Sequence, residues 1–201
     1  MIAGFRAPVS KGYTLIEVVV ALGLSLLTLS AVYSLYVTEL KAQIVRENML
    51  DMHQQARVVV DLVSREILMA GYDPRGVNKD SDLTNNFYGI TYDPAQLIIK
   101  SDLNGNGTPS NANESIVFSL DSVTHTLRRN TGGGRQPFGE NIESFVVQYW
   151  DQDGNPTTDS LSIRQVGITV TARTADPDPN YSDNGGYRTV TLHSRITPRN
   201  L

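Results

Sequence analysis

The chain has 201 residues, of which 17 are basic and 21 acidic, and its formal net charge is −4. An acidic chain has no general electrostatic attraction for nucleic acid. There is no cysteine, which excludes a disulfide framework and a thiolate metal site. The length suits one membrane helix followed by one soluble domain of ordinary size.

The first long segment is apolar. From Val18 to Thr38 no residue is charged and none is proline, and about 20 apolar residues are enough for a helix to cross a bilayer core. A secretory signal peptide would have a shorter apolar region with a small-residue cleavage site after it. Here the small residue, Gly12, comes before the run, so cleavage there would keep the membrane segment on the mature protein. Arg6 and Lys11 precede the run and favour a cytoplasmic amino terminus and an exported remainder.

The junction reads Lys11-Gly12-Tyr13-Thr14-Leu15-Ile16-Glu17-Val18. It resembles the class III signal of type IV pilins and of type II secretion pseudopilins, in which a prepilin peptidase cleaves after glycine and N-methylates the new first residue. The resemblance implies a leader peptide of residues 1–12, cleavage between Gly12 and Tyr13, and methylation of Tyr13. The family usually has Phe at this position, and Tyr13 keeps the aromatic ring.

Glu17 lies just inside the amino-terminal edge of the apolar run. A carboxylate in a membrane segment costs several kcal/mol unless it is paired. One interpretation is that Glu17 reaches the lipid headgroups from the helix edge. The resemblance favours another, in which Glu17 pairs with the positive amino terminus of Tyr13 on a neighbouring subunit and sets the register of assembly.

A single long helix is expected next, because no proline occurs from Tyr13 to Ala70 and the only glycine is Gly23. Gly23 either softens the helix or permits close packing of a neighbouring helix. We expect residues 13–40 to form the transmembrane and filament-core half and residues 41–72 to form an amphipathic half. Gly71 as the C′ residue and Pro74 beyond it predict where the helix ends.

The amphipathic half carries apolar or weakly polar residues at three- and four-residue steps, which predicts a face that packs on the soluble domain. These residues are Leu50, His53, Ala56, Val60, Val63, Ile67 and Ala70. No second histidine stands at ligand spacing from His53, so a packed or partly exposed histidine is expected there rather than a metal ligand.

The helix end reads Arg65-Glu66-Ile67-Leu68-Met69-Ala70-Gly71-Tyr72, and Gln54-Gln55-Ala56-Arg57 precedes it. This run is similar to the helix end of PilW-type minor pilins. The resemblance implies a subunit that joins other minor pilins and the major pilin at an inner-membrane assembly platform, primes pilus assembly and sits near the tip. It also implies an inner-membrane location before assembly and a pilus location afterwards. J-type minor pseudopilins of type II secretion systems share the layout and remain the alternative, and a tip adhesin or ligand-binding module is a third.

Residues 73–201 change to short β-prone runs separated by Gly, Asn, Asp and Pro, several with apolar/polar alternation. The expected strands are Tyr88–Tyr92, Gln96–Lys100, Ser115–Leu120, Thr124–Arg129, Ile142–Trp150, Ser162–Ala172 and Arg188–Ile196. The expected loops are Asn78–Asn86, Asn130–Gly139 and Ala175–Gly186. The predicted fold class is therefore α+β, type IV pilin-like, with a long amino-terminal helix packed on an antiparallel β-rich head.

One loop of the head has the spacing of a calcium site. The oxygen-bearing residues are Asp102, Asn104, Asn106, Thr108, Ser110, Asn113 and Glu114. Gly107 stands at the sharp-turn position, but Asn113 occupies the twelfth position and the acid Glu114 comes one residue late. Calcium is the one cofactor this loop could hold, with modest affinity, and the alternative is an ordinary hairpin loop. No cofactor is otherwise required.

The remaining motifs give weaker indications of a binding or catalytic site. Asp151–Asp159 has Pro156 where a calcium loop needs glycine and is expected to be a turn. Gly132-Gly133-Gly134-Arg135 lacks the strand–loop–helix context of a phosphate loop. No metalloprotease motif, nucleophile elbow or phosphate-binding lysine motif occurs, so we expect no catalytic residues and no enzyme. Arg128, Arg129 and Arg135 could form a basic patch, but direct nucleic acid binding is not expected of this acidic chain.

Overall fold

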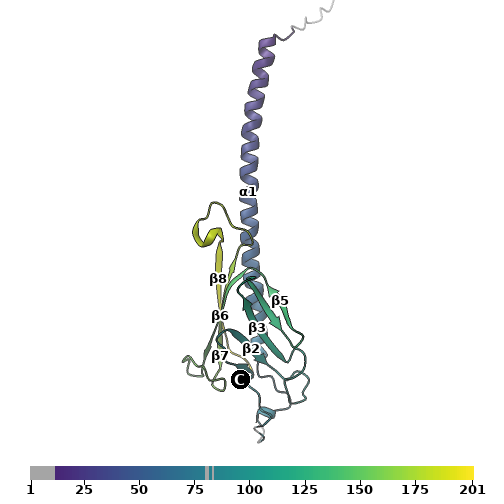
Figure 1. Ribbon diagram of the computed structural model, residues 1–201, viewed down its shortest axis with the longest axis vertical. Coiled ribbons are helices and arrows are strands. Elements are labelled where there is room, and N and C mark those ends of the chain that lie inside the picture. Colours follow the sequence, from purple (N-terminus) through teal and green to yellow (C-terminus); the bar gives the residue numbers. More distant parts are fainter. Residues whose placement is uncertain (1–11, 80–81, 83) are drawn as a thin grey trace, which may run out of the picture. The chain divides into compact units, whose positions relative to one another are not determined.

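The computed structural model of the protein describes residues 12–79, 82 and 84–201 (Figure 1). Arg6, Lys11 and most of the predicted leader lie outside the described residues. Helix α1 spans Leu15–Leu68 without interruption. The chain divides into two compact units that meet between Arg46 and Glu47, and each is described by itself.

In the first unit α1 carries no charged residue from Val18 to Thr38 and is apolar on all sides there. Most of the large apolar side chains from Leu15 to Leu40 are exposed. Within the described part of the chain, α1 is the one helix long and apolar enough to cross a membrane, judged by length and composition. A helix that is apolar all round is stable only where lipid or other protein covers it.

The second unit contains two antiparallel sheets. The five-stranded sheet has the spatial order β1 (Ile90–Thr91), β2 (Gln96–Lys100), β3 (Ser115–Asp121), β4 (Thr126–Asn130) and β5 (Arg135–Gly139). The three-stranded sheet has the order β6 (Ile142–Trp150), β7 (Gln165–Arg173) and β8 (Thr189–Ile196). In the described residues, two short 3₁₀ helices, Val77–Lys79 and Asp183–Gly186, lie in the connections.

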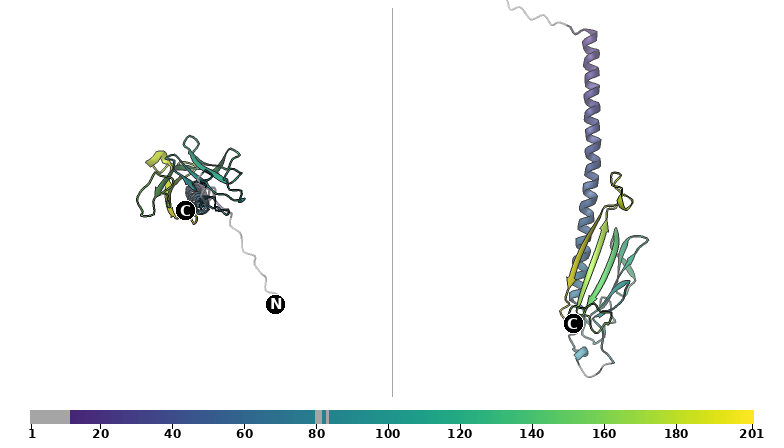
Figure 2. Two further views of the ribbon diagram at one scale, coloured as in Figure 1. Left: turned by 90° about the horizontal axis from the view of Figure 1, so that it is seen from below. Right: turned by 90° about the vertical axis from the view of Figure 1, so that its left-hand side faces the viewer.

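The part of α1 that begins at Glu47 lies against both sheets (Figure 2). Its buried residues are Met52, Ala56, Val59, Val63 and Ile67. They share one core cluster with inward-facing residues of the sheets, such as Phe118 of β3 and Ile168 of β7. The structure confirms the expected α+β class, with one long helix and antiparallel sheets.

The predicted packing stripe is wrong at its amino end. Leu50 is 68% exposed and His53 is also exposed, whereas Met52 and Val59 are buried. The observed stripe keeps three- and four-residue steps but begins two residues later. Of the predicted residues, Ala56, Val63, Ile67 and Ala70 are buried, and Val60 is partly buried against the core.

Among the predicted strands, the largest error is β5, which lies inside the predicted loop Asn130–Gly139. Proline is unfavourable inside a sheet, so Pro137 indicated a loop. However, β5 is an edge of the five-stranded sheet, where the missing N–H of proline removes no hydrogen bond between strands. Elsewhere the structure shortens strands: Tyr88–Tyr92 reduces to Ile90–Thr91, and β4 begins at Thr126 because His125 adopts a positive φ of 48° in the turn before it.

Candidate functional site

The amino-terminal candidate residues lie at the start of α1. Gly12 and Tyr13 precede the helix and are exposed, and Tyr13 is 88% exposed. Glu17 lies in the first helical turn. The backbone at the predicted cleavage position is therefore neither helical nor covered within the described chain.

Glu17 and Thr14 form a capping box, which the sequence reasoning missed although the spacing Thr-x-x-Glu signals it. Glu17 Oε2 accepts hydrogen bonds from the Thr14 N–H and the Thr14 hydroxyl, each at 2.8 Å. The Thr14 hydroxyl accepts one from the Glu17 N–H at 3.3 Å. Two donors at the helix start are thereby satisfied without water. Within the described residues, Glu17 Oε1 makes no hydrogen bond.

Three hydroxyl groups in the apolar part of α1 donate hydrogen bonds to carbonyl groups of the same helix. Ser25 donates to the Ala21 carbonyl at 2.8 Å, Thr28 to the Ser25 carbonyl at 2.8 Å, and Thr38 to a carbonyl one turn earlier at 2.9 Å. A hydroxyl that bonds its own helix adds little cost when the helix enters a lipid or protein environment. Ser25, Thr28 and Thr38 are therefore compatible with a helix that is covered by lipid or protein.

The second candidate segment is the helix end, Arg65–Tyr72. Glu66 Oε1 accepts a hydrogen bond from Arg129 Nη2 of β4 at 2.7 Å. Ile67 and Ala70 are fully buried. Helix α1 ends at Leu68, three residues before the predicted C′ residue Gly71. Gly71 has a φ of +73°, at which an L-residue is strained.

Beyond the helix the backbone hydrogen-bonds to the last residue of β2, Lys100. Gly71 N–H donates to the Lys100 carbonyl at 2.9 Å, and Lys100 N–H donates to the Gly89 carbonyl at 2.8 Å. Gly89 lies so close that a Cβ there would stand 2.4 Å from the Gly71 nitrogen. The side chain of Leu201 packs against both glycines, so the helix end, the β1–β2 region and the chain's last residue form one compact junction.

The predicted calcium loop folds around two buried carboxylates, those of Asp102 and Glu114, which are 0% and 1% exposed. Asp102 Oδ1 accepts N–H groups of Gly105 and Asn106 at 2.8 and 3.1 Å, and its Oδ2 accepts that of Gly107 at 2.8 Å. Gly105 and Gly107 have φ values of +73° and +87°, which turn these amides inward.

Glu114 completes this arrangement. Its Oε1 accepts the Asn104 N–H at 3.2 Å and its Oε2 accepts the Asn111 N–H at 2.9 Å. Burial raises the pKa of Glu114, but the amides of Asn111 and Asn104 outweigh it and the net pKa is lowered. Every oxygen of the two carboxylates already accepts an amide, so a calcium ion would have to share or replace these bonds.

The other predicted ligands bond within the loop. Asn104 Oδ1 accepts the Asn106 N–H at 2.9 Å, and Asn106 Oδ1 accepts from the N–H and hydroxyl of Thr108 at 2.8 and 3.0 Å. The Thr108 and Ser110 hydroxyls lie 3.3 Å apart. Asn113 has a φ of +68° and donates its N–H to the Thr131 carbonyl at 3.2 Å. In the described residues no group of three His, Cys, Asp or Glu could hold a metal, and calcium stays a prediction.

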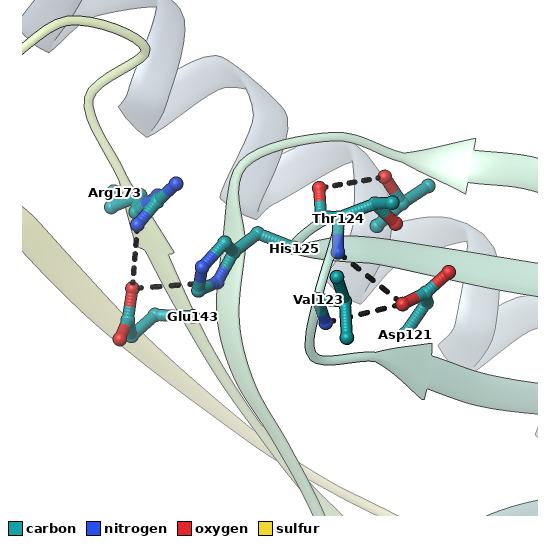
Figure 3. A network of polar contacts seen from close by, with 7 residues as sticks. Asp121, Val123, Thr124, His125, Glu143 and Arg173 are labelled. Atoms are coloured by element: carbon teal, nitrogen blue, oxygen red, sulfur yellow. Dashed lines mark hydrogen bonds and ion pairs between the residues drawn. The ribbon is translucent and has the colours of Figure 1, made fainter.

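A polar cluster between the sheets was not predicted (Figure 3). Glu143 of β6 lies between His125 of the β3–β4 turn and Arg173 of β7, with its Oε2 3.7 Å from His125 Nδ1 and 3.5 Å from Arg173 Nη1. The Arg173 guanidinium stacks 4.3 Å from the ring centroid of Tyr187. The His125 carbonyl also accepts the Ile142 N–H at 2.8 Å. These contacts connect the β3–β4 turn to the three-stranded sheet.

The predicted basic patch is divided by strand alternation. Arg129 points to the core side and pairs with Glu66, whereas Arg128 lies on the outer side, where its Nε and Nη2 are each 3.2 Å from Asp121 Oδ2. Arg135 on β5 lines the same open pocket as Arg128. The three arginines therefore do not form one patch.

These features define a class: an α+β protein that has, in its described residues, one candidate membrane helix capped by Thr14 and Glu17 and an antiparallel β head. No protein-family model and no curated protein matches the sequence. Among solved structures, the chain is similar to a type IV-like pilin from Thermus thermophilus, with a TM-score of 0.47 and 11% identity over 74% of this chain and 97% of that chain. A likeness at this level transfers no role by itself.

Proposed function

We propose that the protein is a pilin-type subunit, a minor type IV pilin of PilW type that takes part in priming and assembling a pilus near its tip. The observation that carries the proposal is the exposed Gly12–Tyr13 junction directly before a helix that is apolar on all sides, with Glu17 in its first turn. The role is assembly rather than catalysis.

Processing comes first. A prepilin peptidase would cleave after Gly12 and methylate the new amino terminus at Tyr13. The exposed, non-helical backbone of Gly12–Thr14 supports this step, because a protease needs an extended segment. The chain would wait in the inner membrane, with its head outside the cytoplasm.

Assembly follows from the uncovered helix. Each fully buried Val, Leu or Ile gains about 1.5–3 kcal/mol over exposure to water, and Leu15–Leu40 exposes many such side chains. The bilayer covers them before assembly, and helices of other minor and major pilins would cover them in the filament. An inner-membrane platform would move the subunit between these environments.

Glu17 would make that transfer selective. Its Oε2 is held by Thr14 while its Oε1 is free within the described chain, so one oxygen is available to the amino group of a neighbouring Tyr13. A buried carboxylate is tolerated only when it is paired. A neighbouring subunit in the correct register would therefore remove the free-energy cost of burying the Glu17 carboxylate, whereas a subunit in the wrong register would not.

The test separates the charge of Glu17 from its capping role. Glu17→Gln keeps an oxygen that can cap Thr14 but removes the charge, whereas Glu17→Ala removes both. We expect both variants to insert into the membrane and lose incorporation into sheared filaments, and mass spectrometry of the native chain to find N-methylated Tyr13 as the first residue. Glu39→Gln, an exposed acid further along α1, is the matched control and should assemble normally.

Normal piliation in Glu17→Gln would contradict the pairing, and an uncleaved native chain would contradict the pilin proposal. A deletion strain that keeps its pili but fails to secrete proteins would instead favour the J-type pseudopilin. No binding of the head to cells, DNA or partner pilins would remove the tip adhesin alternative.

A further inference from the structure

The outer side of the five-stranded sheet carries an open pocket of ≈420 Å³, which includes none of the residues on which the assembly proposal rests. It lies where β3 and β4 approach their shared turn, beside the edge strand β5. Its volume falls within the usual range of small-molecule pockets. The lining residues are Ser119, Leu120, Asp121, Ser122, Arg128 and Arg135.

The pocket holds one fixed acid. Asp121 Oδ1 accepts the N–H groups of Val123 and Thr124 at 3.1 and 3.3 Å (Figure 3). Hydrogen bonds from Thr124, through its side chain and then its backbone, lower the pKa of Asp121. The carboxylate therefore stays ionised at neutral pH and can only accept hydrogen bonds, which suits a ligand that offers hydroxyl groups.

Two arginine side chains also line the pocket, and they differ in whether they have partners. Arg128 is oriented by Asp121 through Nε and Nη2, and its Nη1 makes no hydrogen bond in the described chain. Arg135, on the free edge of the sheet, is exposed, and its guanidinium has neither an ion pair nor a hydrogen bond among the described residues. The Ser119 and Ser122 hydroxyls are likewise without partners there. Two guanidinium groups against one carboxylate leave the pocket positive in an acidic chain.

We propose that this pocket binds an acidic sugar, a hexuronate unit whose carboxylate contacts Arg135 and Arg128 and whose hydroxyls donate to Asp121. Arginine binds carboxylates through two parallel hydrogen bonds, and the serine hydroxyls complement ring hydroxyls. A nucleic acid fits less well, because a single free arginine neutralises few phosphates. The site is independent of the pilin assignment, so either can fail without the other.

The test uses the full-length chain in detergent, titrated calorimetrically with glucuronate, glucose, inorganic phosphate and a short DNA duplex. We expect saturable binding of glucuronate, no heat from glucose, and weaker binding of phosphate and DNA. Arg135→Gln should weaken glucuronate binding at least about tenfold. The matched control is Arg199→Gln, an exposed arginine outside the pocket, which should bind like the native chain.

A second variant separates ligand hydroxyl recognition from simple anion attraction. Ser122→Ala should weaken glucuronate binding while leaving phosphate binding unchanged. Absence of glucuronate binding by the native chain would overturn the proposal. Equal affinity for phosphate and glucuronate, or displacement of glucuronate by DNA, would overturn it in favour of a plain oxyanion or nucleic acid site.

Discussion

Glu66 and Arg129 connect the last turns of α1 to strand β4, with Arg129 Nη2 2.7 Å from Glu66 Oε1 and side chains that are 30% and 28% exposed. Loss of one partner leaves a partly buried charge, which costs more than an exposed pair is worth. We expect Glu66→Gln to lower the free energy of unfolding of a soluble fragment, residues 41–201, by about 1–3 kcal/mol. Urea denaturation measures this directly.

The Arg65–Asp61 pair provides the control one turn away. It is an i,i+4 pair with side chains 71% and 60% exposed, and such pairs contribute about 0.3–0.5 kcal/mol. Asp61→Asn should therefore change stability far less than Glu66→Gln. Similar losses in both variants would mean that the Glu66–Arg129 pair contributes no more to the free energy of unfolding than an exposed pair does.

Close packing of Gly71 and Gly89 predicts a second sensitive position. A Cβ at Gly89 would stand 2.4 Å from the Gly71 nitrogen and 2.6 Å from the Leu201 side chain, and the backbone atom cannot move away without disturbing the bond from Gly71 to Lys100. We expect Gly89→Ala to cost about 1–3 kcal/mol by strain. Gly133→Ala, where no atom lies within 4 Å, is the control, and an equal melting temperature in the two variants would contradict the prediction.

Local patterns were enough to predict the long helix and most strands. The positive φ of Gly71 was predictable because a chain that leaves a helix through a left-handed residue favours glycine there. Alternation also identified β7, whose Val166, Ile168 and Val170 are buried as the pattern indicates. These features depend on neighbours in the sequence, so the sequence alone contains them.

Other features depend on contacts between distant segments. Pro137 was compatible with a strand only because β5 is an edge of its sheet, which no local pattern reveals. The separation of Arg128 from Arg129 follows from strand alternation and was available from the sequence, but the partner Glu66 was not. The cluster of Glu143 with His125 and Arg173 joins three separate elements and leaves no signal in the sequence.

That cluster predicts a third effect. Glu143 lies between His125 and Arg173, so Glu143→Gln would leave the guanidinium without a counter-charge beside the β3–β4 turn. We expect faster amide hydrogen exchange at Ile142, whose N–H donates a hydrogen bond to the His125 carbonyl. We also expect a loss of about 1–2 kcal/mol in the free energy of unfolding. Glu140→Gln, an exposed acid just before β6, is the control. Unchanged exchange at Ile142 would show that the ion contacts do not hold the turn.

Acid sensitivity follows from the carboxylates with lowered pKa. Outside the membrane segment, these are Asp82, Asp93, Glu114, Asp121, Asp151, Asp159 and Asp178. In Asp178 the cause is the Asn180 amide first and Arg188 second. A group whose folded pKa lies below its unfolded value stabilises the fold above the unfolded pKa and loses that contribution as the pH falls through the folded pKa.

The melting temperature of the 41–201 fragment should therefore be flat from about pH 8 to 5 and fall below about pH 4, where carboxylates take up protons. Asp178→Asn should lower stability at pH 7 and reduce the dependence on acid. A decline that begins near pH 6.5 instead would point to histidine protonation and contradict the assignment to carboxylates.

The Asp102–Glu114 loop is predicted to bind calcium, and the backbone N–H groups that bond its two carboxylates limit which variants can test this. Because all four carboxylate oxygens accept N–H groups, Asp102→Ala would destabilise the loop even without calcium and cannot serve alone. Asn104→Ala is sharper, since Asn104 Oδ1 accepts one bond at an exposed position yet would be a calcium ligand. For a dissociation constant near 1 mM, 10 mM calcium should add about 1.4 kcal/mol to the stability of the native fragment.

The expected result is a saturable rise in melting temperature with calcium, absent with magnesium and reduced in Asn104→Ala, whose stability without calcium stays near that of the native fragment. Magnesium is the right comparison because it demands a stricter octahedral geometry than this flexible set of oxygens provides. No shift at 10 mM calcium would mean that backbone amides alone neutralise Asp102 and Glu114. The loop would then be an ordinary hairpin connection, stabilised by the same hydrogen bonds that lower the pKa of Glu114.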